Sequence, residues 1–285
     1  MCFVPGYTAT VKTASKTQTL MLPVRSLYAQ DAYNDYANAK GKASSSYTEP
    51  TTELVAQQIA DIKTSVNNNG GFYIARYEAG SGAQSGTNNR KSANTSDTAQ
   101  TIITANGMPV CKANQKPYNF ITQSQAKELA ESMYTGKSFT CTLPTGAALD
   151  RTLGWIIETE NKDLSKVTYD SSDWGNYSNI EFGVEAEAQG TTNIKNYAAI
   201  TDSKKPASYM LLTTGAAPDR NVSNNIFDLA GNVYEWTTEV YGSRLVVRGG
   251  NFVGTGYDFP SSFRITYNAT DAISGIGFRP ALYVK

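Results

Sequence analysis

The sequence predicts an α+β fold built from short strands, two or three helices and much irregular loop. Three observations lead to this fold class. Apolar residues recur at helical spacing in a few stretches that have recognisable ends, strand-like runs are short, and Gly, Asn, Ser and Thr separate them throughout the 285 residues. A chain of this length, with 40% apolar residues, can bury the core of one large or two small domains.

Helix signals occur at three places. The first is residues 51–71, where a Thr can cap the start and a run of Asn and Gly ends the helix. In the second, Thr122 and Gln125 have the spacing of a capping box, and Gly136 follows the end. A third helix is expected to start at Thr145, in LPTGAALDRTLGWI.

Short strands and loops account for the rest of the pattern. Between the helices, Gly80 to Gly107 is rich in Gly, Ser, Thr and Asn and is interpreted as a long surface insertion. Residues 161–221 have no periodicity that predicts a long element. The segments that read as short strands are residues 72–77, 225–236, 244–248 and 277–284.

The expected domain organisation has two parts. Residues 1–48 combine short alternating stretches with the small-residue run Lys40 to Ser46, which predicts an N-terminal extension and linker. Residues 49–285 are expected to form the folded domain. No apolar run approaches the roughly 20 residues that span a bilayer, so we expect no membrane insertion.

Charge and residue types exclude several function classes. The 25 basic and 25 acidic side chains cancel, which gives no reason to expect nucleic acid as a partner. The absence of histidine removes Ser-His-Asp and Cys-His nucleophiles and His-ligated metals. Cys2, Cys111 and Cys141 have no zinc-like spacing and are interpreted as ordinary thiols, with a Cys111–Cys141 bridge as the alternative.

Four motifs and a closing segment occur in a fixed order. They are FYIARYEAG, LPTGAALDRTLGW, NNIFDLAGNVYEWT and VVRGGNF, followed by GFRPALYV. In this order they resemble the formylglycine-generating enzyme or sulfatase-modifying factor family over about residues 72–285. The resemblance implies a C-type-lectin-like fold. GNVYEW followed by RGG and GFR is the most specific part of the match.

The motif residues are expected to maintain the fold. Asp228 can accept hydrogen bonds from turn amides, and Trp236 is a large buried anchor. Arg248 and Arg279 can tie loop carbonyls or a carboxylate such as Glu235 together. Gly231 and Gly249-Gly250 allow backbone positions that a Cβ would block.

The resemblance also implies where a catalytic site would lie. Enzymatic family members carry a redox-active cysteine pair just after RGG, spaced five residues apart. Here those positions are Gly254 and Phe259, and neither can form a thiolate or bind copper. We therefore expect no enzyme activity and no catalytic residue, and formylglycine-generating oxidase chemistry remains the enzyme alternative.

No cofactor or metal is expected. The family's calcium sites imply that Asn232 and Glu235 could contribute oxygen ligands, but no DxDxDG-like loop accompanies them and hydrogen bonding is favoured. The sugar-binding triplets of calcium-dependent lectins are also missing, because Glu49-Pro50-Thr51 precedes the expected domain.

The segment between RGG and GFR resembles a second group with this fold. It is similar to the C-terminal repeat of the variable proteins of diversity-generating retroelements, in which template adenines are randomised. Ser261 and Arg264 fall on fixed residues, and GFR is reached in register at Gly277. The positions that align with template Asn codons are Val253, Gly254, Thr255, Tyr257, Asp258, Phe263, Ile265, Thr266, Tyr267, Asn268, Asp271, Ile273, Ser274 and Gly275.

The residue types in this segment fit adenine-directed mutagenesis. Changing the adenines of AAC or AAT never produces Lys, Glu, Gln, Met or Trp, and residues 251–276 contain none of these five. They make up about a sixth of the chain, so composition alone would give this absence roughly once in a hundred. An ordinary Gly, Thr and Tyr loop is the alternative.

These observations predict a non-catalytic display protein that binds a protein or surface receptor through its variable region, about residues 251–276. Tyr257, Phe263 and Tyr267 are the candidate anchors, because Tyr and Phe supply contact area at low entropic cost. Phe252, Phe259 and Phe278 are assigned to the core. The expected location is a virion or a cell surface. A structural virion or surface protein without a selected ligand is the third alternative.

Overall fold

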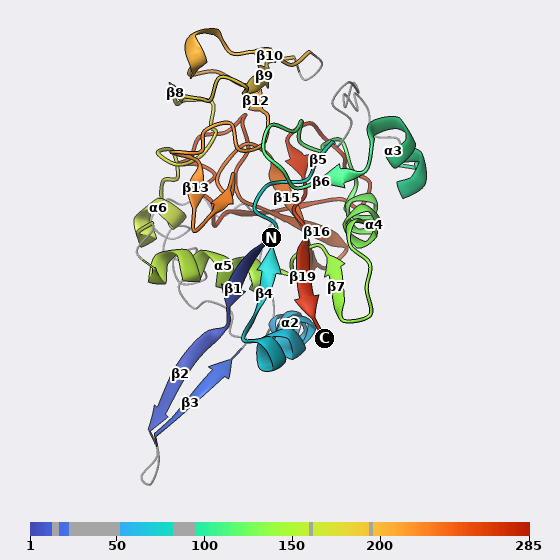
Figure 1. The fold of residues 1–285 in the computed structure, drawn as a ribbon, viewed down its shortest axis with the longest axis vertical. Helices are drawn as coiled ribbons and strands as arrows, with labels where there is room; N and C mark the ends of the chain where they lie inside the picture. Colours follow the sequence, from blue (N-terminus) through green and yellow to red (C-terminus); the bar gives the residue numbers. More distant parts are fainter. Residues whose placement is uncertain (13–16, 23–51, 82–94, 160–161, 194–195) are drawn as a thin grey trace.

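The computed structural model of the chain describes residues 1–12, 17–22, 52–81, 95–159, 162–193 and 196–285. Five α-helices and many short strands lie among long irregular segments in this part of the chain, so the predicted α+β fold class is confirmed (Figure 1). None of the described helices has the length and apolar character that crossing a membrane would require.

The first four-stranded sheet brings the two ends of the chain together. Its order is β1-β4-β19-β7, and all neighbouring strands are antiparallel. The strands are β1 (Cys2–Pro5), β4 (Gly71–Ile74), β7 (Phe139–Thr142) and β19 (Ala281–Val284). β19, the last strand, is an inner strand that joins β4 to β7 (Figure 1).

The second four-stranded sheet contains parts of the GNVYEW and VVRGG motifs of the C-terminal half. Its order is β17-β16-β15-β18, with β18 parallel to β15 and the other pairs antiparallel. The strands are β15 (Tyr234–Tyr241), β16 (Arg244–Arg248), β17 (Arg264–Tyr267) and β18 (Ile276–Gly277). The sequence pattern did not predict β17, which lies at the edge of the sheet inside residues 251–276.

The three predicted helices are present: α2 (Thr52–Asn69), α4 (Gln123–Met133) and α5 (Gly146–Glu158). The predicted capping box is confirmed, because the Thr122 side chain accepts a hydrogen bond from the Gln125 amide and the Gln125 side chain accepts one from the Thr122 amide. At the start of α5, Thr145 Oγ1 accepts a hydrogen bond from the Ala148 amide at 3.0 Å.

Two further helices correct the sequence interpretation. The structure has α3 (Ala99–Asn106) inside residues that were interpreted as surface insertion, and a short α6 (Leu164–Thr168). Thr98 caps α3 by accepting a hydrogen bond from the Thr101 amide at 3.2 Å, and Ile102 is buried. Short helices of this kind depend on tertiary packing rather than on propensity, so their sequence signal is weak.

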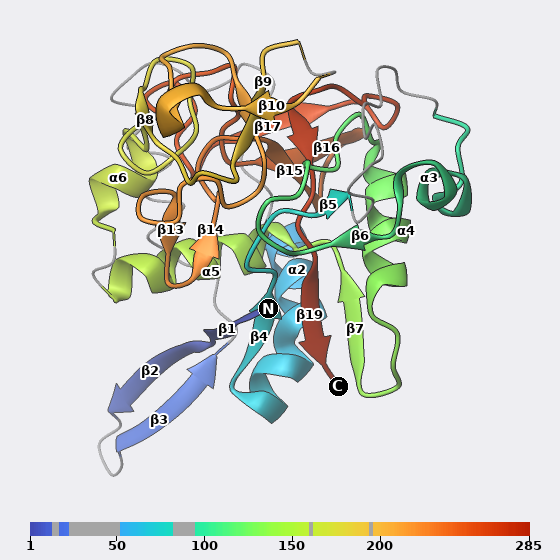
Figure 2. The same ribbon diagram turned by 45° about the horizontal axis from the view of Figure 1, so that its top comes forward.

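Small two- and three-stranded pieces connect these elements, and the hairpin β2–β3 projects from the body in both ribbon views (Figures 1 and 2). Their bounds are β2 (Tyr7–Lys12), β3 (Thr17–Leu22), β5 (Gly80–Ser81), β6 (Pro109–Val110), β8 (Phe182–Gly183), β9 (Gln189–Thr191), β10 (Ala198–Ala199), a 3-10 turn (Thr201–Ser203), β11 (Lys204–Lys205), β12 (Leu211–Leu212), β13 (Val222–Ser223) and β14 (Ile226–Phe227).

The N-terminal strand belongs to the sheet of the domain. The sequence assigned residues 1–48 to an extension and linker, yet Cys2–Pro5 pairs along its whole length with Gly71–Ile74. Residues 23–51, which would contain the expected linker, lie outside the described residues. The boundary expected at residue 48 therefore stays a prediction, and the first strand is an addition to the predicted domain.

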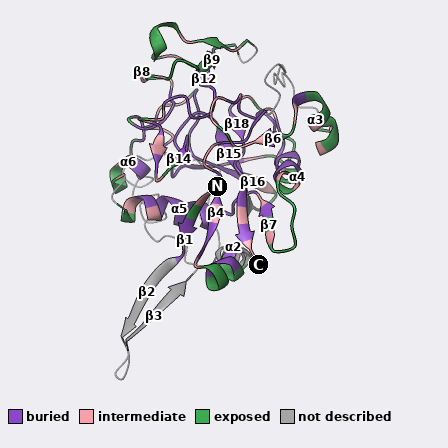
Figure 3. Cartoon of the chain, in the orientation of Figure 1, coloured by how far each residue is buried: buried purple, intermediate pink, exposed green. Residues whose placement is uncertain are grey.

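Buried residues fill the middle of the molecule (Figure 3). Two large apolar clusters lie among them. One packs α2 and α5 against the first sheet and includes Phe72, Leu153 and Trp174. The other packs α4 against the second sheet and includes Trp236, which has no exposed surface and donates a hydrogen bond from Nε1 to the Ile121 carbonyl at 2.8 Å. Trp236 is thus the buried anchor that its motif predicted.

Candidate functional site

The candidate site is the segment 251–276, called here the display segment. It leaves the end of β16, passes α6 and the loop at 171–178, forms β17 and returns to β18. Its two ends lie close together, because a Cβ on Gly275 would be 2.5 Å from Nδ2 of Asn251. The side chain of Asn251 also accepts hydrogen bonds from the amides of Val253 and Gly254. Contacts at Asn251 therefore hold the two ends of the display segment in place, and the exposed residues of the segment lie between these ends.

A buried ion cluster holds the middle of the display segment to α5. Arg264 is completely buried and its guanidinium donates to both carboxylate oxygens of Asp150. Arg248 Nη2 donates to Asp150 Oδ1 at 2.7 Å and its Nη1 donates to the Gly146 carbonyl at 3.3 Å. One carboxylate thus joins the RGG arginine to the arginine that was predicted to be fixed. Asp150 was not among the predicted site residues, because its only signal in the sequence is an acidic residue beside the apolar face of a helix.

The other residue predicted to be fixed is also tied to the scaffold. Ser261 is buried, its hydroxyl donates to the Val167 carbonyl at 3.0 Å, and its amide donates to Ser171 Oγ at 2.9 Å. The Tyr177 hydroxyl donates to the Phe259 carbonyl at 2.8 Å. The backbone around 259–264 is therefore attached at several points to α6 and the loop that follows it.

The fourteen predicted binding positions divide by exposure. Four are exposed: Val253, Tyr257, Asn268 and Ile273. Seven are half-buried: Gly254, Thr255, Asp258, Ile265, Tyr267, Asp271 and Ser274. We call these eleven residues the display surface. By contrast, nine of the other twelve residues in 251–276 are buried. The structure therefore separates the aligned positions from the rest of the segment.

Three of the fourteen positions are corrections, because Phe263, Thr266 and Gly275 are buried. Phe263 packs in the second core cluster, with its ring centroid 4.9 Å from that of Phe259, so it is not a candidate anchor. Thr266 lies in β17 directly opposite Val246 and is 2% exposed. The Phe263 and Thr266 side chains are buried against the scaffold and are not available to a ligand.

The other aromatic residues were predicted to be either core residues or candidate anchors, and the structure shows how far each is buried. Phe252 and Phe278 are buried, as predicted, and Phe259 is half-buried against the second core cluster. Tyr267 is half-buried with its ring edge against Trp236, at a centroid distance of 6.2 Å. Tyr257 is 39% exposed, which leaves it as the anchor most accessible to a partner.

The polar groups of the display surface are ordered by short local hydrogen bonds. The Thr255 hydroxyl donates to Asp258 Oδ2 at 3.0 Å, and the Asp258 amide donates back to Thr255 Oγ1 at 3.0 Å. Asp271 Oδ2 accepts from the Asn268 amide at 2.7 Å. The two carboxylates are the acidic groups of the segment, and its one basic side chain, Arg264, is buried. The surface therefore offers apolar contacts and hydrogen-bond acceptors, without an exposed cation of its own.

The two positions that align with the catalytic cysteines are in contact. A Cβ added to Gly254 would overlap the ring of Phe259. The thiols that the chain does possess are elsewhere: all three cysteines are free, Cys111 lies after β6 and Cys141 lies in β7. Burial raises the pKa of the Cys111 thiol to about 12, and burial likewise raises the pKa of Cys141 to about 12. A protonated thiol is a poor nucleophile and a poor metal ligand.

A second buried polar centre lies under the GNVYEW motif. Arg279 donates from Nε and Nη2 to Glu235 Oε1, at 2.9 and 2.7 Å, and all three acidic side chains around it, Glu78, Asp228 and Glu235, are buried. Burial raises the pKa of Asp228 to about 6 and that of Glu78 well above its ordinary value. Asp228 accepts a hydrogen bond from the Gly215 amide at 2.7 Å, which is the turn contact that its motif predicted.

Asn232 and Glu235, the residues considered for calcium, are both engaged in this centre. Asn232 Nδ2 donates to Glu78 Oε2 at 2.6 Å, and its Oδ1 accepts from the Leu212 amide at 3.1 Å and from Asn176 Nδ2 at 3.0 Å. Within the described ranges, no three or more Cys, Asp or Glu side chains gather in a way that could hold a metal ion. These residues bind the loop around Gly231 to the core.

Fold and motifs together define a mixed α/β domain of the formylglycine-generating type. A family model for the sulfatase-modifying factor enzyme 1-like domain matches residues 30–283, so the chain belongs to this family. The family includes enzymes. No curated protein sequence matches the chain.

Two solved structures are similar to this chain over nearly all of its length. Variable protein 1 of Treponema denticola is 14% identical, with 99% of this chain and 94% of that chain covered and a TM-score of 0.32. The crystal structure of CarF is 15% identical, with 100% of this chain and 97% of that chain covered and a TM-score of 0.30.

Proposed function

We propose that this protein is a non-catalytic ligand-binding protein whose display segment is diversified by a retroelement. The observation that carries the proposal is the division of residues 251–276 by exposure. Eleven of the fourteen aligned positions are exposed or half-buried, whereas Ser261, Arg264 and Gly277, which the alignment predicts to be fixed, are all buried. A scaffold that is held by buried contacts can accept changes at exposed positions with little loss of stability.

The residue types of the segment support the same proposal. Lys, Glu, Gln, Met and Trp are absent from residues 251–276, although they are common in the rest of the chain. Surface segments usually carry Lys and Glu, so their absence from a segment with this much exposed surface is unusual. Adenine-directed changes of Asn codons explain the absence, because they cannot produce any of these five residues.

The chemistry of the display surface favours a protein partner. Val253, Tyr257 and Ile273 are each about two-fifths exposed, at 44%, 39% and 40%. Exposed Tyr and aliphatic side chains beside short polar ones are typical of protein-binding loops, since Tyr combines contact area with a hydrogen-bonding group. The carboxylates of Asp258 and Asp271 would favour a partner that presents donors or positive charge.

The experiment that tests display is a pair of libraries in the full chain. In the first, Val253, Tyr257, Asn268 and Ile273 are randomised together with the codons that AAC and AAT can produce. We expect most members to remain soluble, with melting temperatures close to that of the parent, because exposed sites contribute within about 0.5 kcal/mol each. Selection of this library against an arbitrary protein target should give binders.

The control library randomises the buried positions Phe263, Thr266 and Gly275 with the same codons. We expect most of its members to be destabilised, as Trp236→Ala should be, at a cost of about 3–5 kcal/mol. Equal losses of stability in the two libraries would mean that the display surface is part of the core. A stable first library that yields no binders would contradict the binding role.

A further inference from the structure

Two cations outside the display segment share one aromatic ring. Lys205 in β11 lies opposite Phe182 in β8, and its ammonium nitrogen is 5.5 Å from the ring centroid. The guanidinium carbon of Arg220 is 4.2 Å from the same centroid. Lys205 has no exposed surface and Arg220 is half-buried, yet neither forms an ion pair with a carboxylate of the described residues. A fully buried lysine is rare unless it is paired, so other groups stabilise its charge.

Backbone carbonyls of one loop take the place of carboxylates around these cations. We call this loop, residues 172–180, the support loop. Four of its carbonyls accept hydrogen bonds from the two cations: those of Tyr177 and Ile180 from Lys205, and those of Ser172 and Gly175 from Arg220. Burial lowers the pKa of Lys205 to about 8 and that of Arg220 to about 10, so both side chains are charged at pH 7. Two charged donors thus hold a single loop.

The support loop in turn holds the first half of the display segment. The Ser178 amide and the Ser178 hydroxyl both donate to the Gly254 carbonyl, at 2.9 and 2.8 Å. The Tyr177 hydroxyl donates to the Phe259 carbonyl at 2.8 Å. The acceptors in these three hydrogen bonds are main-chain carbonyls. The support loop therefore holds the backbone of the segment in a way that does not depend on which side chains the display positions carry.

We propose that Lys205 and Arg220 are positioning residues of the display surface, which act on it through the support loop. Hydrogen bonds from charged donors are stronger than those from neutral ones, so the two cations hold the loop more firmly than neutral side chains would. The loop then presents donors at fixed positions to the display segment. The consequence for ligand binding rests on the proposed function, whereas the consequence for the loop and the segment does not.

Hydrogen exchange of the full chain, followed by mass spectrometry, tests this connection without a ligand. Lys205→Met keeps an unbranched apolar stem and removes the charged donor. We expect amide exchange in the support loop and in residues 253–259 to be at least about tenfold faster in this variant than in the parent. A role confined to overall stability would instead speed exchange throughout the chain.

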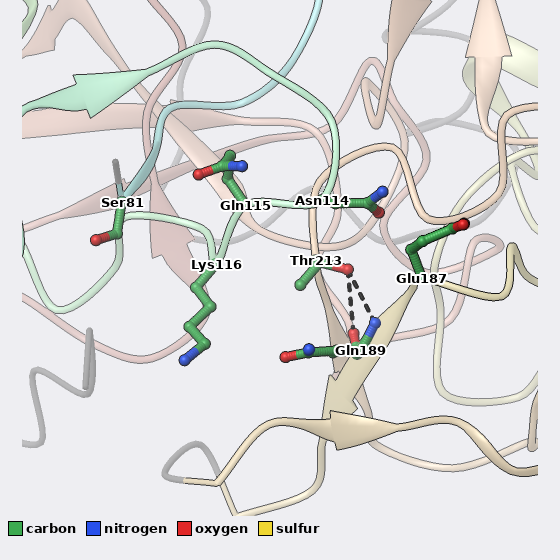
Figure 4. Close-up of a pocket in the computed structure, with 7 residues that line it drawn as sticks. All are labelled: Ser81, Asn114, Gln115, Lys116, Glu187, Gln189 and Thr213. Atoms are coloured by element: carbon green, nitrogen blue, oxygen red, sulfur yellow. Dashed lines mark hydrogen bonds between the residues drawn. The ribbon is translucent and has the colours of Figure 1, made fainter. Parts of the chain in front are cut away.

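Two regions that do not contact the cations serve as internal references. One is α4, and the other is the pocket of about 330 Å³ shown in Figure 4, which Asn114 and Glu187 help to line. At this pocket the Gln189 amide donates to Thr213 Oγ1 at 3.1 Å, and the Thr213 amide donates to the Gln189 carbonyl at 2.9 Å. Exchange in both regions should be the same in Lys205→Met as in the parent.

Matched variants separate the buried cations from surface charge. Lys204→Met is the control, because Lys204 is the adjacent residue in β11, is exposed and pairs with Glu181. Its exchange should match that of the parent everywhere. Arg220→Lys keeps the charge but replaces the fork of donors with a single ammonium group. It should speed exchange in the same two segments, and it decides the question if Lys205→Met does not fold.

Affinity tests the consequence for binding. A binder selected from the first library should bind its target at least about tenfold more weakly after Lys205→Met, because the display surface is less preorganised, and equally well after Lys204→Met. Unchanged affinity after Lys205→Met would overturn the positioning role in binding. The proposal is also wrong if exchange in the two segments stays at the parent's rate in Lys205→Met and Arg220→Lys, or rises equally in the reference regions. A library without any binder would contradict the proposed function, and the exchange result would still decide this inference.

Discussion

The ring of Phe259 occupies the space into which any side chain at Gly254 would point. These are the two positions at which catalytic members of the family are expected to carry cysteines. The two positions are in contact in this fold, and neither residue has a thiol. In place of a redox pair, the chain has an aromatic ring packed on a glycine, beside Tyr234 and Phe263.

This contact predicts a coupling between the two positions. Gly254→Ala should lower the free energy of unfolding by about 1–3 kcal/mol, because the new methyl overlaps the Phe259 ring. In a Phe259→Ala background the same change should cost much less. Urea denaturation of the two single variants and the double variant measures the coupling. Gly183→Ala is the control, since its added Cβ would have only the Ser203 carbonyl oxygen nearby, at 4.0 Å. Additive effects of Gly254→Ala and Phe259→Ala would contradict the packing.

The same two residues predict the absence of oxidase activity. Incubated with a sulfatase-derived peptide, copper and oxygen, the purified protein should give no formylglycine by mass spectrometry. Cys111 and Cys141 should not substitute for the missing pair, because burial raises the pKa of each thiol to about 12 and keeps it protonated at neutral pH. Formylglycine that is formed by the parent and lost in Cys111→Ser or Cys141→Ser would show that the protein is an enzyme.

Arg264 should be essential to the fold even though it lies inside the display segment. Arg264→Ala leaves the buried Asp150 with Arg248 as its remaining arginine partner, and we expect a cost of about 3–5 kcal/mol in thermal or urea unfolding. Asn268→Ala, four residues along and exposed, is the matched control and should stay within about 0.5 kcal/mol of the parent. If Arg264→Ala were as stable as the control, the ion cluster would not be what anchors the segment.

The buried acidic centre predicts a pH dependence of stability. Burial raises the pKa of Asp228 from its ordinary value of 3.8 to about 6. The hydrogen bond from the Gly215 amide and the charge of Arg279 lower this pKa, but burial has the larger effect. The folded state therefore keeps a proton that the unfolded chain has lost. This contribution to stability is complete below pH 3.8 and disappears as the pH rises through about 6.

Asp228→Asn tests this directly, because Asn cannot ionise, can still accept the hydrogen bond from Gly215 and tolerates the left-handed backbone at φ of 57°. We expect the melting temperature of the variant to fall less than that of the parent between pH 4 and pH 7, as followed by circular dichroism. Glu78, whose pKa is also raised by burial, remains in the variant and leaves part of the slope. Parallel profiles would show that Asp228 does not titrate in this range.

The sequence predicted the parts of this fold that have local signals. Thr122 with Gln125, and Thr145, identify helix starts because capping depends on residues three apart. It could not predict β17, since the four residues become a strand only by pairing with Arg244–Arg248. That pairing also sets which side chains are buried, so the exposure of Thr266 was not visible from the sequence.

Contacts between residues far apart in the chain explain why other features of the site were not predicted from the sequence. The partner of Arg264 is Asp150, 114 residues earlier in the chain, and no sequence pattern connects the two. Similarly, Asn114 and Glu187 line one pocket although they belong to separate loops. The candidate display positions were predicted from the residue types in the segment and from its register between RGG and GFR. Neither of these reveals which positions are exposed. Their division into exposed and buried sets required the structure.

The measurement that tests the central claim most directly is the third base of the codons at the fourteen aligned positions. Adenine-directed mutagenesis of AAC or AAT changes the first two bases and keeps the third. The account therefore predicts C or T at nearly every one of these codons, and a nearby template repeat with AAC or AAT in the same register. Ordinary Val, Gly, Thr and Ser codons often end in A or G. Several such codons at Val253, Gly254, Thr255, Thr266, Ser274 and Gly275, with no template repeat nearby, would contradict diversification by a retroelement.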